Sequence, residues 1–254
     1  MKEERSTMPF AETALRDEYA AAVEQLSGRT LDAVRDGGGA AVPADTTGWD
    51  GAGDADGRTR RPLLAAARVL GANLFAPQLL VGAPPDEATA ALLAEARGAL
   101  PVPTAGTEAG ALAIAWQDWA ARSVLAATPH ADTGAATPPP PAPPGPADLG
   151  WQVWSVRMAQ LSVLALPGLD GAVHDAARAH TLDLARGTVR AMLRRDPTTA
   201  VRLARWLAWA QADGRPVRLE VEPVLDRIGF VGDGTARSGL ELAVARSLLK
   251  GAQR

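Results

Sequence analysis

Apolar residues recur along most of the chain at steps of three and four positions, the spacing of one face of an α-helix. The longest such pattern covers residues 9–36 and predicts an amphipathic helix that ends at the glycines of 37–39. The same spacing, with capping residues and prolines at the breaks, predicts further helices over about residues 62–75, 86–97, 107–127, 148–166, 170–195, 196–213 and 238–250. The chain is therefore expected to be predominantly all-α.

The pattern changes to a period of two after Gly214. Val217, Leu219 and Val221 alternate with charged residues, which predicts a short strand with one apolar side. A lone strand is not stable, so residues 228–231 are expected to pair with it. The C-terminal part should thus contain a small β-hairpin before its last helix.

Two stretches that are poor in large apolar residues divide the chain. One is rich in Gly, Ala, Asp and Thr and predicts a flexible linker. The other contains the run TPPPPAPPGP, whose prolines favour polyproline II and are typical of a semi-rigid spacer. We therefore expect an N-terminal helix, a linker, a first helical lobe, the proline-rich spacer and a second lobe with the hairpin and the terminal helix, over residues 1–36, 37–60, 61–128, 129–147 and 148–254. The N-terminal helix either docks on the body or is held out for a partner.

Six of the seven tryptophans occur as three WxxW pairs within predicted helices. Residues at i and i+3 share one helix face, so each pair forms a broad aromatic surface. The simplest interpretation is a tryptophan-braced core; the alternatives are hot spots at a protein interface and the wall of a pocket for an apolar ligand. The interaction candidates are Trp116, Trp119, Trp151, Trp154, Trp206 and Trp209.

Composition narrows the class of protein. The 254 residues are 47% hydrophobic, which is enough for a substantial core. Cysteine is absent, which removes disulfides, thiolate metal sites and cysteine nucleophiles and fits a cytoplasmic protein. No segment offers about 18 uninterrupted apolar residues, so we expect no membrane span.

Charge is distributed unevenly. The net charge of −3 divides into −8 for residues 1–150, from 11 basic and 19 acidic side chains, and +5 for residues 151–254, from 15 and 10. This asymmetry could attract the two halves to each other or to separate partners. Arginine fills 24 positions and lysine only two, which is typical of codon bias, as in a bacterial genome, rather than of a binding adaptation.

His174, Asp175 and His180 are the most obvious candidates for chemistry, because a His-Asp pair on a helix forms the core of a family of metal-dependent phosphohydrolases. On a regular helix, however, positions 174 and 180 lie about 120° apart and cannot chelate one ion. We therefore interpret both histidines as ordinary core or surface residues. We expect no metal and no cofactor.

The segment Gly232–Thr235 is glycine-rich and precedes a helix, as phosphate loops do. Its four letters, GDGT, resemble a nucleotide-contacting motif of the chaperonins, and the resemblance would imply phosphate contact. The lysine of a P-loop is missing. Ser238 and Glu241 form a capping-box pattern, so a turn before a capped helix explains the glycines more simply.

A basic stripe runs along the predicted helix that follows residue 170, formed by Arg186, Arg190 and Arg194. Two helices, a tight turn and a hairpin are also typical of a winged helix, in which three arginines would project outward together: Arg202, Arg205 and Arg218. The would-be recognition helix, VRLARWLAWA, is too apolar to read base edges, so we expect no nucleic-acid partner. The stripe is most simply a solvated face, and its arginines join the tryptophans as candidates for protein interaction.

No nucleophile, base or paired carboxylate stands in a recognisable catalytic context, and the interpretation leans away from an enzyme. Our hypothesis from the sequence is a non-catalytic protein-interaction component, an adaptor or assembly factor with one or more protein partners. The first alternative is a helical enzyme or small-molecule binder of specialised metabolism with a tryptophan-lined pocket into which His174 points. The second alternative is a DNA-binding regulator.

Overall fold

The computed structural model describes residues 8–42, 60–131 and 138–252, and within these ranges it contains helices and no strand. The first group of helices comprises α1 (Met8–Arg35), α2 (Arg60–Leu70), the short 3-10 helix η2 (Gly71–Phe75), α3 (Ala76–Leu80), α4 (Glu87–Ala99) and α5 (Glu108–Leu125). The second comprises α6 (Pro146–Leu149), α7 (Trp151–Gln160), η3 (Ser162–Leu164), α8 (Ala172–Ala179), α9 (Thr181–Leu193), α10 (Pro197–Ala212), α11 (Val221–Val231) and α12 (Ala236–Ala252). The predominantly helical class is confirmed.

Local capping explains where several of these helices begin. The side chain of Asp86 accepts a hydrogen bond from the Thr89 amide at the start of α4, at 2.9 Å. Asp196 caps α10 in the same way, and Pro197 occupies the first helical position, where its missing amide hydrogen costs nothing. Both starts agree with the predicted ones.

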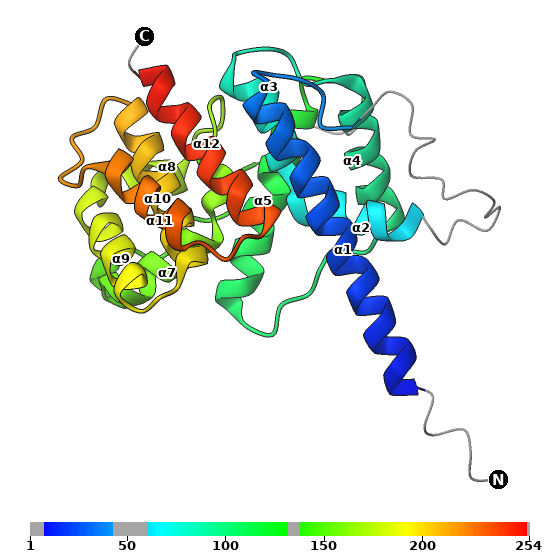
Figure 1. Ribbon diagram of the computed structural model, residues 1–254, viewed down its shortest axis with the longest axis horizontal. Coiled ribbons are helices and arrows are strands. Elements are labelled where there is room, and N and C mark those ends of the chain that lie inside the picture. Colours follow the sequence, from blue (N-terminus) through cyan, green and yellow to red (C-terminus); the bar gives the residue numbers. More distant parts are fainter. Residues whose placement is uncertain (1–7, 43–59, 132–137, 253–254) are drawn as a thin grey trace.

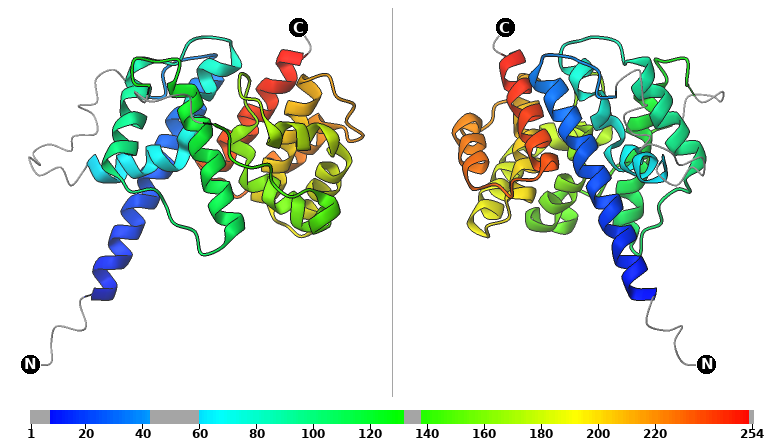
Figure 2. Two further views of the ribbon diagram at one scale, coloured as in Figure 1. Left: turned by 180° about the vertical axis from the view of Figure 1, so that it is seen from behind. Right: turned by 45° about the vertical axis from the view of Figure 1, so that its right-hand side comes forward.

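Helix α1 ties the two ends of the chain together. It lies along α2 and α12, so the N-terminal and C-terminal helices pack side by side (Figure 1). Its residues from Ala22 onward contribute to the core, and Leu26 is fully buried. Residues 13–21 are exposed, apart from the half-buried Tyr19, and the start of the helix extends beyond the other helices in every view (Figure 2). The helix therefore docks on the body through its C-terminal half only.

The predicted β-hairpin is wrong. Residues 221–231 form α11, because Val221, Leu225 and Ile228 recur at helical steps and bury one face. Pro223 lies in the first turn of that helix, where a proline is tolerated. Residues 228–231, the expected second strand, belong to α11, so the alternating residues before it have no strand to pair with.

The predicted spacer between two lobes is also not supported. Its described residues are 129–131 and 138–147, which are irregular up to the start of α6 at Pro146. The carbonyl of Pro141 accepts a hydrogen bond from the indole Nε1 of Trp116 in α5 at 3.1 Å. Buried apolar residues from both sides of this segment form one cluster. The two groups of helices thus share a core, while residues 43–59 of the predicted linker and residues 132–137 fall outside the described ranges.

One helical stretch, Arg60–Leu80, is long and apolar enough to cross a membrane by length and composition. It is interrupted by η2, and 67% of its most apolar window is buried inside the protein. Packing against α1, α4 and α5 accounts for its apolar character.

Candidate functional site

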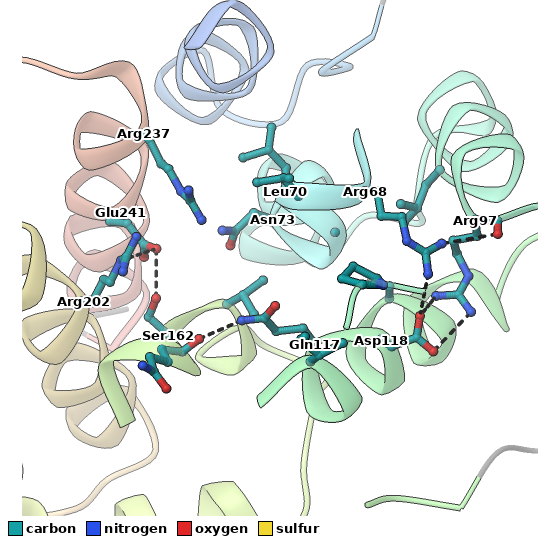
Figure 3. Close-up of a pocket in the computed structure, with 18 residues that line it drawn as sticks. Arg68, Leu70, Asn73, Arg97, Gln117, Asp118, Ser162, Arg202, Arg237 and Glu241 are labelled. Carbon is teal, nitrogen blue, oxygen red and sulfur yellow. Dashed lines mark hydrogen bonds and ion pairs between the residues drawn. The ribbon is translucent and has the colours of Figure 1, made fainter. Parts of the chain in front are cut away.

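A cavity of about 290 Å³ opens where the two groups of helices meet (Figure 3). Helices α2, η2, α4 and α5 supply one side of its wall, and η3, α10 and α12 supply the other. Charged side chains gather at its two ends, with Leu70, Asn73 and Gln117 between them. The cavity thus combines two ionic ends with a partly apolar middle.

At one end of the cavity, the wall residues Asn73 and Glu241 are held by the fully buried Arg205. Arg205 lies in the apolar helix α10, and its Nη1 donates to Glu241 Oε2 at 2.7 Å and to Asn73 Oδ1 at 2.8 Å. Its Nε donates to the carbonyl of Ala165 at 3.1 Å. A charge removed from water must be paired and hydrogen-bonded, and these contacts satisfy that need across four segments of the chain.

Glu241 serves both the core and the cavity. One carboxylate oxygen binds Arg205, and the other accepts a hydrogen bond from the Ser162 hydroxyl at 2.9 Å. Burial raises the pKa of this carboxyl, but the charge and hydrogen bond of Arg205, the charge of Arg202 and the hydrogen bond from Ser162 together hold the pKa below its usual range. Glu241 is therefore ionised and helps to line the cavity wall.

Two further arginines face this end of the cavity with weaker pairing. The Nε of Arg202 lies 4.0 Å from Glu241 Oε1, at the outer limit of an ion pair. Arg237 points into the cavity and has no hydrogen bond or ion pair with any described residue. Burial lowers the pKa of Arg237, repulsion from Arg202 lowers it further, and attraction to Glu241 and Glu24 opposes both effects. The Arg237 cation is thus held where its charge is poorly compensated.

Asp118 organises the opposite end. Its carboxylate binds Arg97 and Arg122, the latter through Nε at 3.0 Å, and lies 3.9 Å from Nη2 of Arg68. Burial lowers the pKa of Arg68, an effect that attraction to Asp118 opposes. The Arg68 Nε is buried and has no hydrogen-bond partner in the described structure. One carboxylate therefore serves three guanidinium groups.

The charge balance of the wall favours anions. Four arginines and two carboxylates line the cavity, which leaves a formal excess of two positive charges. Guanidinium groups present planar sets of donors that match carboxylate and phosphate oxygens. No histidine lines the cavity, and the described residues contain no cluster of three or more His, Asp or Glu side chains placed to hold a metal ion. The arrangement can bind an anion, and its hydroxyl beside a carboxylate, Ser162 on Glu241, belongs to the Arg205 network.

The structure separates the histidine candidates. His174 is buried between Trp206 and Trp209, with ring centroids 5.5 and 5.0 Å away, and its Nε2 hydrogen-bonds the carbonyl of Leu164 at 2.9 Å. His180 follows α8 and lies edge-on to Trp154. The two histidines do not meet in one site.

The tryptophans divide between core and surface. Trp116, Trp154 and Trp206 are fully buried, Trp209 is nearly so, and Trp119 and Trp151 are partly exposed. The Trp116/Trp119 and Trp206/Trp209 pairs stack edge to face, at 5.2 and 5.6 Å between ring centroids. None of the six lines the arginine-rich cavity.

The arginine candidates also differ in placement. Arg186 binds Asp183 at 3.2 Å, the Arg190 guanidinium lies 5.9 Å from the Trp151 ring centroid, and Arg194 is exposed near the end of α9. The outward group expected for DNA binding does not form, because Arg205 is fully buried and Arg202 lines the cavity.

Sequence patterns missed Arg68, Arg97 and Arg237, considered Arg202 only for DNA binding, and gave Glu241 the wrong partner. Instead of closing a capping box with Ser238, Glu241 binds Arg205. The glycine-rich turn is held by Asp233, which accepts hydrogen bonds from Thr198, Thr235 and Ser238. An available signal was the position of Arg205 and Glu241 inside the apolar runs LARWLAWA and LELAVA, since a charge in such a run must find a buried partner.

Fold and cavity together define the class: a helical protein with an arginine-lined site at the junction of its two groups of helices. No protein-family model, curated protein or solved structure matches the chain.

Proposed function

We propose that this chain is a non-catalytic binder of a small anionic molecule, with the arginine-lined cavity as its site. One observation carries the proposal: Arg237 points into the cavity without any hydrogen-bond partner among the described residues. A partly buried cation without a partner is unfavourable, and a bound carboxylate or phosphate would supply the missing acceptor.

The wall also restricts the ligand. A volume of about 290 Å³ is at the lower end of the range for ligand pockets, so it suits a small metabolite rather than a nucleotide or a peptide. Leu70, Leu93 and Ile114 line the cavity together with the polar groups. A molecule with one or two acidic groups on a short apolar body satisfies both kinds of surface.

The proposal also agrees with the contrast between the buried ion pair of Arg205 and Glu241 and the weakly paired arginines beside it. These two residues hold the wall together, whereas Arg202 and Arg237 make few contacts with the protein and remain available. Poorly paired charges in a cavity cost stability, and such costs concentrate at functional sites. The adaptor role inferred from the sequence would require a different surface.

The test is isothermal titration calorimetry of the full chain against inorganic phosphate, pyrophosphate, succinate, citrate and short fatty acids. We expect at least one of these anions to bind, and Arg237→Gln to weaken its binding about tenfold or more through the loss of a charge-assisted hydrogen bond. Arg246→Gln is the matched control, because Arg246 lies on the same helix but binds the exposed Asp226. That variant should bind like the wild type.

A second measurement separates a binding role from a structural one. Arg237→Gln should unfold at the same temperature as the ligand-free wild type or higher, since it removes a poorly compensated charge. The proposal fails if no anion binds, if the Arg237 variant binds as well as the Arg246 control, or if loss of Arg237 lowers the unfolding temperature of the ligand-free protein.

A further inference from the structure

Helix α9 exposes a stripe of large apolar side chains, none of which lines the cavity. Leu182, Val189 and Leu193 are 43%, 41% and 80% exposed. They line one shallow groove, together with Trp151 from the start of α7 and Leu219 from the segment before α11. Apolar side chains that gather in one groove offer a surface on which a partner can bury its own apolar residues.

These apolar side chains are not exposed because α9 packs poorly on the rest of the protein. The opposite face of the helix is already buried against α7 and α10 through Leu184, Gly187 and Thr188. Gly187 allows this close approach, since a Cβ there would lie 2.5 Å from the Cβ of Ser155. The helix is therefore apolar on two faces, of which one is buried within the chain and the other stays largely exposed.

The groove also carries a distinctive charge pattern. Arg186, Arg190 and Arg218 line it, and no carboxylate does. Asp183, on the same helix, binds Arg186 at 3.2 Å and offsets one of these charges. The groove thus has an apolar floor and a rim with a net positive charge.

We infer that this groove docks an acidic amphipathic helix from a partner protein. The stripe from Leu182 to Leu193 spans eleven residues, or about 16 Å, which matches three turns of a second helix. Such a helix would place apolar residues at i, i+3 or i+4, and i+7 on the floor, with Asp or Glu beside the rim. The positive rim specifies the sign of the flanking charges and would speed association.

A nucleic acid would leave the apolar floor unused, because its outer surface is charged phosphate. A second copy of this chain and an anionic membrane remain as competing occupants that an experiment can distinguish. The inference is independent of the cavity, because no residue lines both sites.

The probe is a fluorescently labelled helical peptide. It has leucines at positions i, i+3 or i+4, and i+7, and glutamates on both sides of this apolar face. Its twin has lysine in place of each glutamate. Fluorescence anisotropy with the full chain should show binding of the glutamate peptide at least about tenfold tighter than the lysine peptide. Val189→Glu should weaken binding by a similar factor, whereas Val153→Glu, at an exposed valine outside the groove, should have no effect.

Charge reversal gives the sharper result. The variant Arg186→Glu/Arg190→Glu/Arg218→Glu should prefer the lysine peptide, and circular dichroism would confirm that it folds. The inference is overturned if the two peptides bind alike or if reversal leaves the preference unchanged. It is equally overturned if the chain self-associates in a manner that Val189→Glu abolishes, or if only vesicles of anionic phospholipid bind.

Discussion

Replacement of Glu241 by glutamine tests how the core and the cavity are joined. The substitution keeps the size of the side chain and one oxygen that can accept from Ser162, but it places an NH2 donor where Glu241 Oε2 accepts from Arg205 and removes the negative charge. The guanidinium retains the Asn73 side chain and the Ala165 carbonyl as acceptors, yet it remains buried without a counter-charge. The variant therefore removes the ion pair and its hydrogen bond while it keeps the volume of the side chain.

Breaking a buried ion pair by removing one partner costs about 3–5 kcal/mol, because the remaining charge stays desolvated. Small proteins are stable by only about 5–15 kcal/mol, so Glu241→Gln should remove a large fraction of the free energy of unfolding. For a chain of this size the unfolding temperature should fall by about 6–20 °C.

Urea unfolding followed by tryptophan fluorescence measures the change, since Trp206 is adjacent to Arg205 and buried in the same region. Asp226→Asn is the matched control: it breaks an ion pair with Arg246 of the same 2.7 Å length on the surface. Exposed pairs contribute only about 0–1 kcal/mol. A loss in Glu241→Gln no larger than in the control would refute the assignment of Arg205 and Glu241 as a coupled pair.

Two further predictions concern the packing of α9 and the dependence on pH. Gly187→Ala should destabilise the protein by about 1–3 kcal/mol, because its Cβ meets Ser155 and overpacks the core, whereas Gly98→Ala in α4, with open space around it, should be neutral or slightly stabilising; urea unfolding distinguishes them. Burial lowers the pKa of His174 despite its hydrogen bond to Leu164. The unfolded chain therefore takes up this proton first, and stability should decline as the pH falls below about 6.5, by at most about 1.4 kcal/mol per unit. His174→Gln should flatten that decline, and equal slopes in wild type and variant would contradict it.

Helices that carry their own local signals were predictable. The periodicity of α1 and the caps Asp86 and Asp196 mark boundaries that depend on neighbouring residues only. The prediction of a hairpin was wrong because its alternating pattern contained only three apolar residues. The last of them, Val221, also starts the helical spacing that continues through Leu225. A pattern that short cannot distinguish a strand from the approach to a helix.

The cavity lies beyond the reach of such patterns. Arg68 and Arg237 line opposite ends of one cavity only because α2 and α12 both pack against α1, which brings distant segments of the chain around the same space. Periodicity assigns a residue to a face of its own helix but does not say which helix that face meets. The apolar stripe of α9 shows the same limit, since Leu182 and Leu193 have the spacing of core residues and yet lie on the surface.

Substitutions in the cavity should affect protein stability and anion binding to different degrees, because its charged residues differ in how many contacts they make with the rest of the protein. Glu241 offers one oxygen to Arg205 and the other to Ser162, so its loss should impair both the fold and the site. Arg237 binds no described residue, so its loss should impair ligand binding alone. Arg202, at 4.0 Å from Glu241, should fall between the two. A structural role for the whole cluster predicts instead that stability decreases in proportion to each lost charge, and the order of the three variants decides between these explanations.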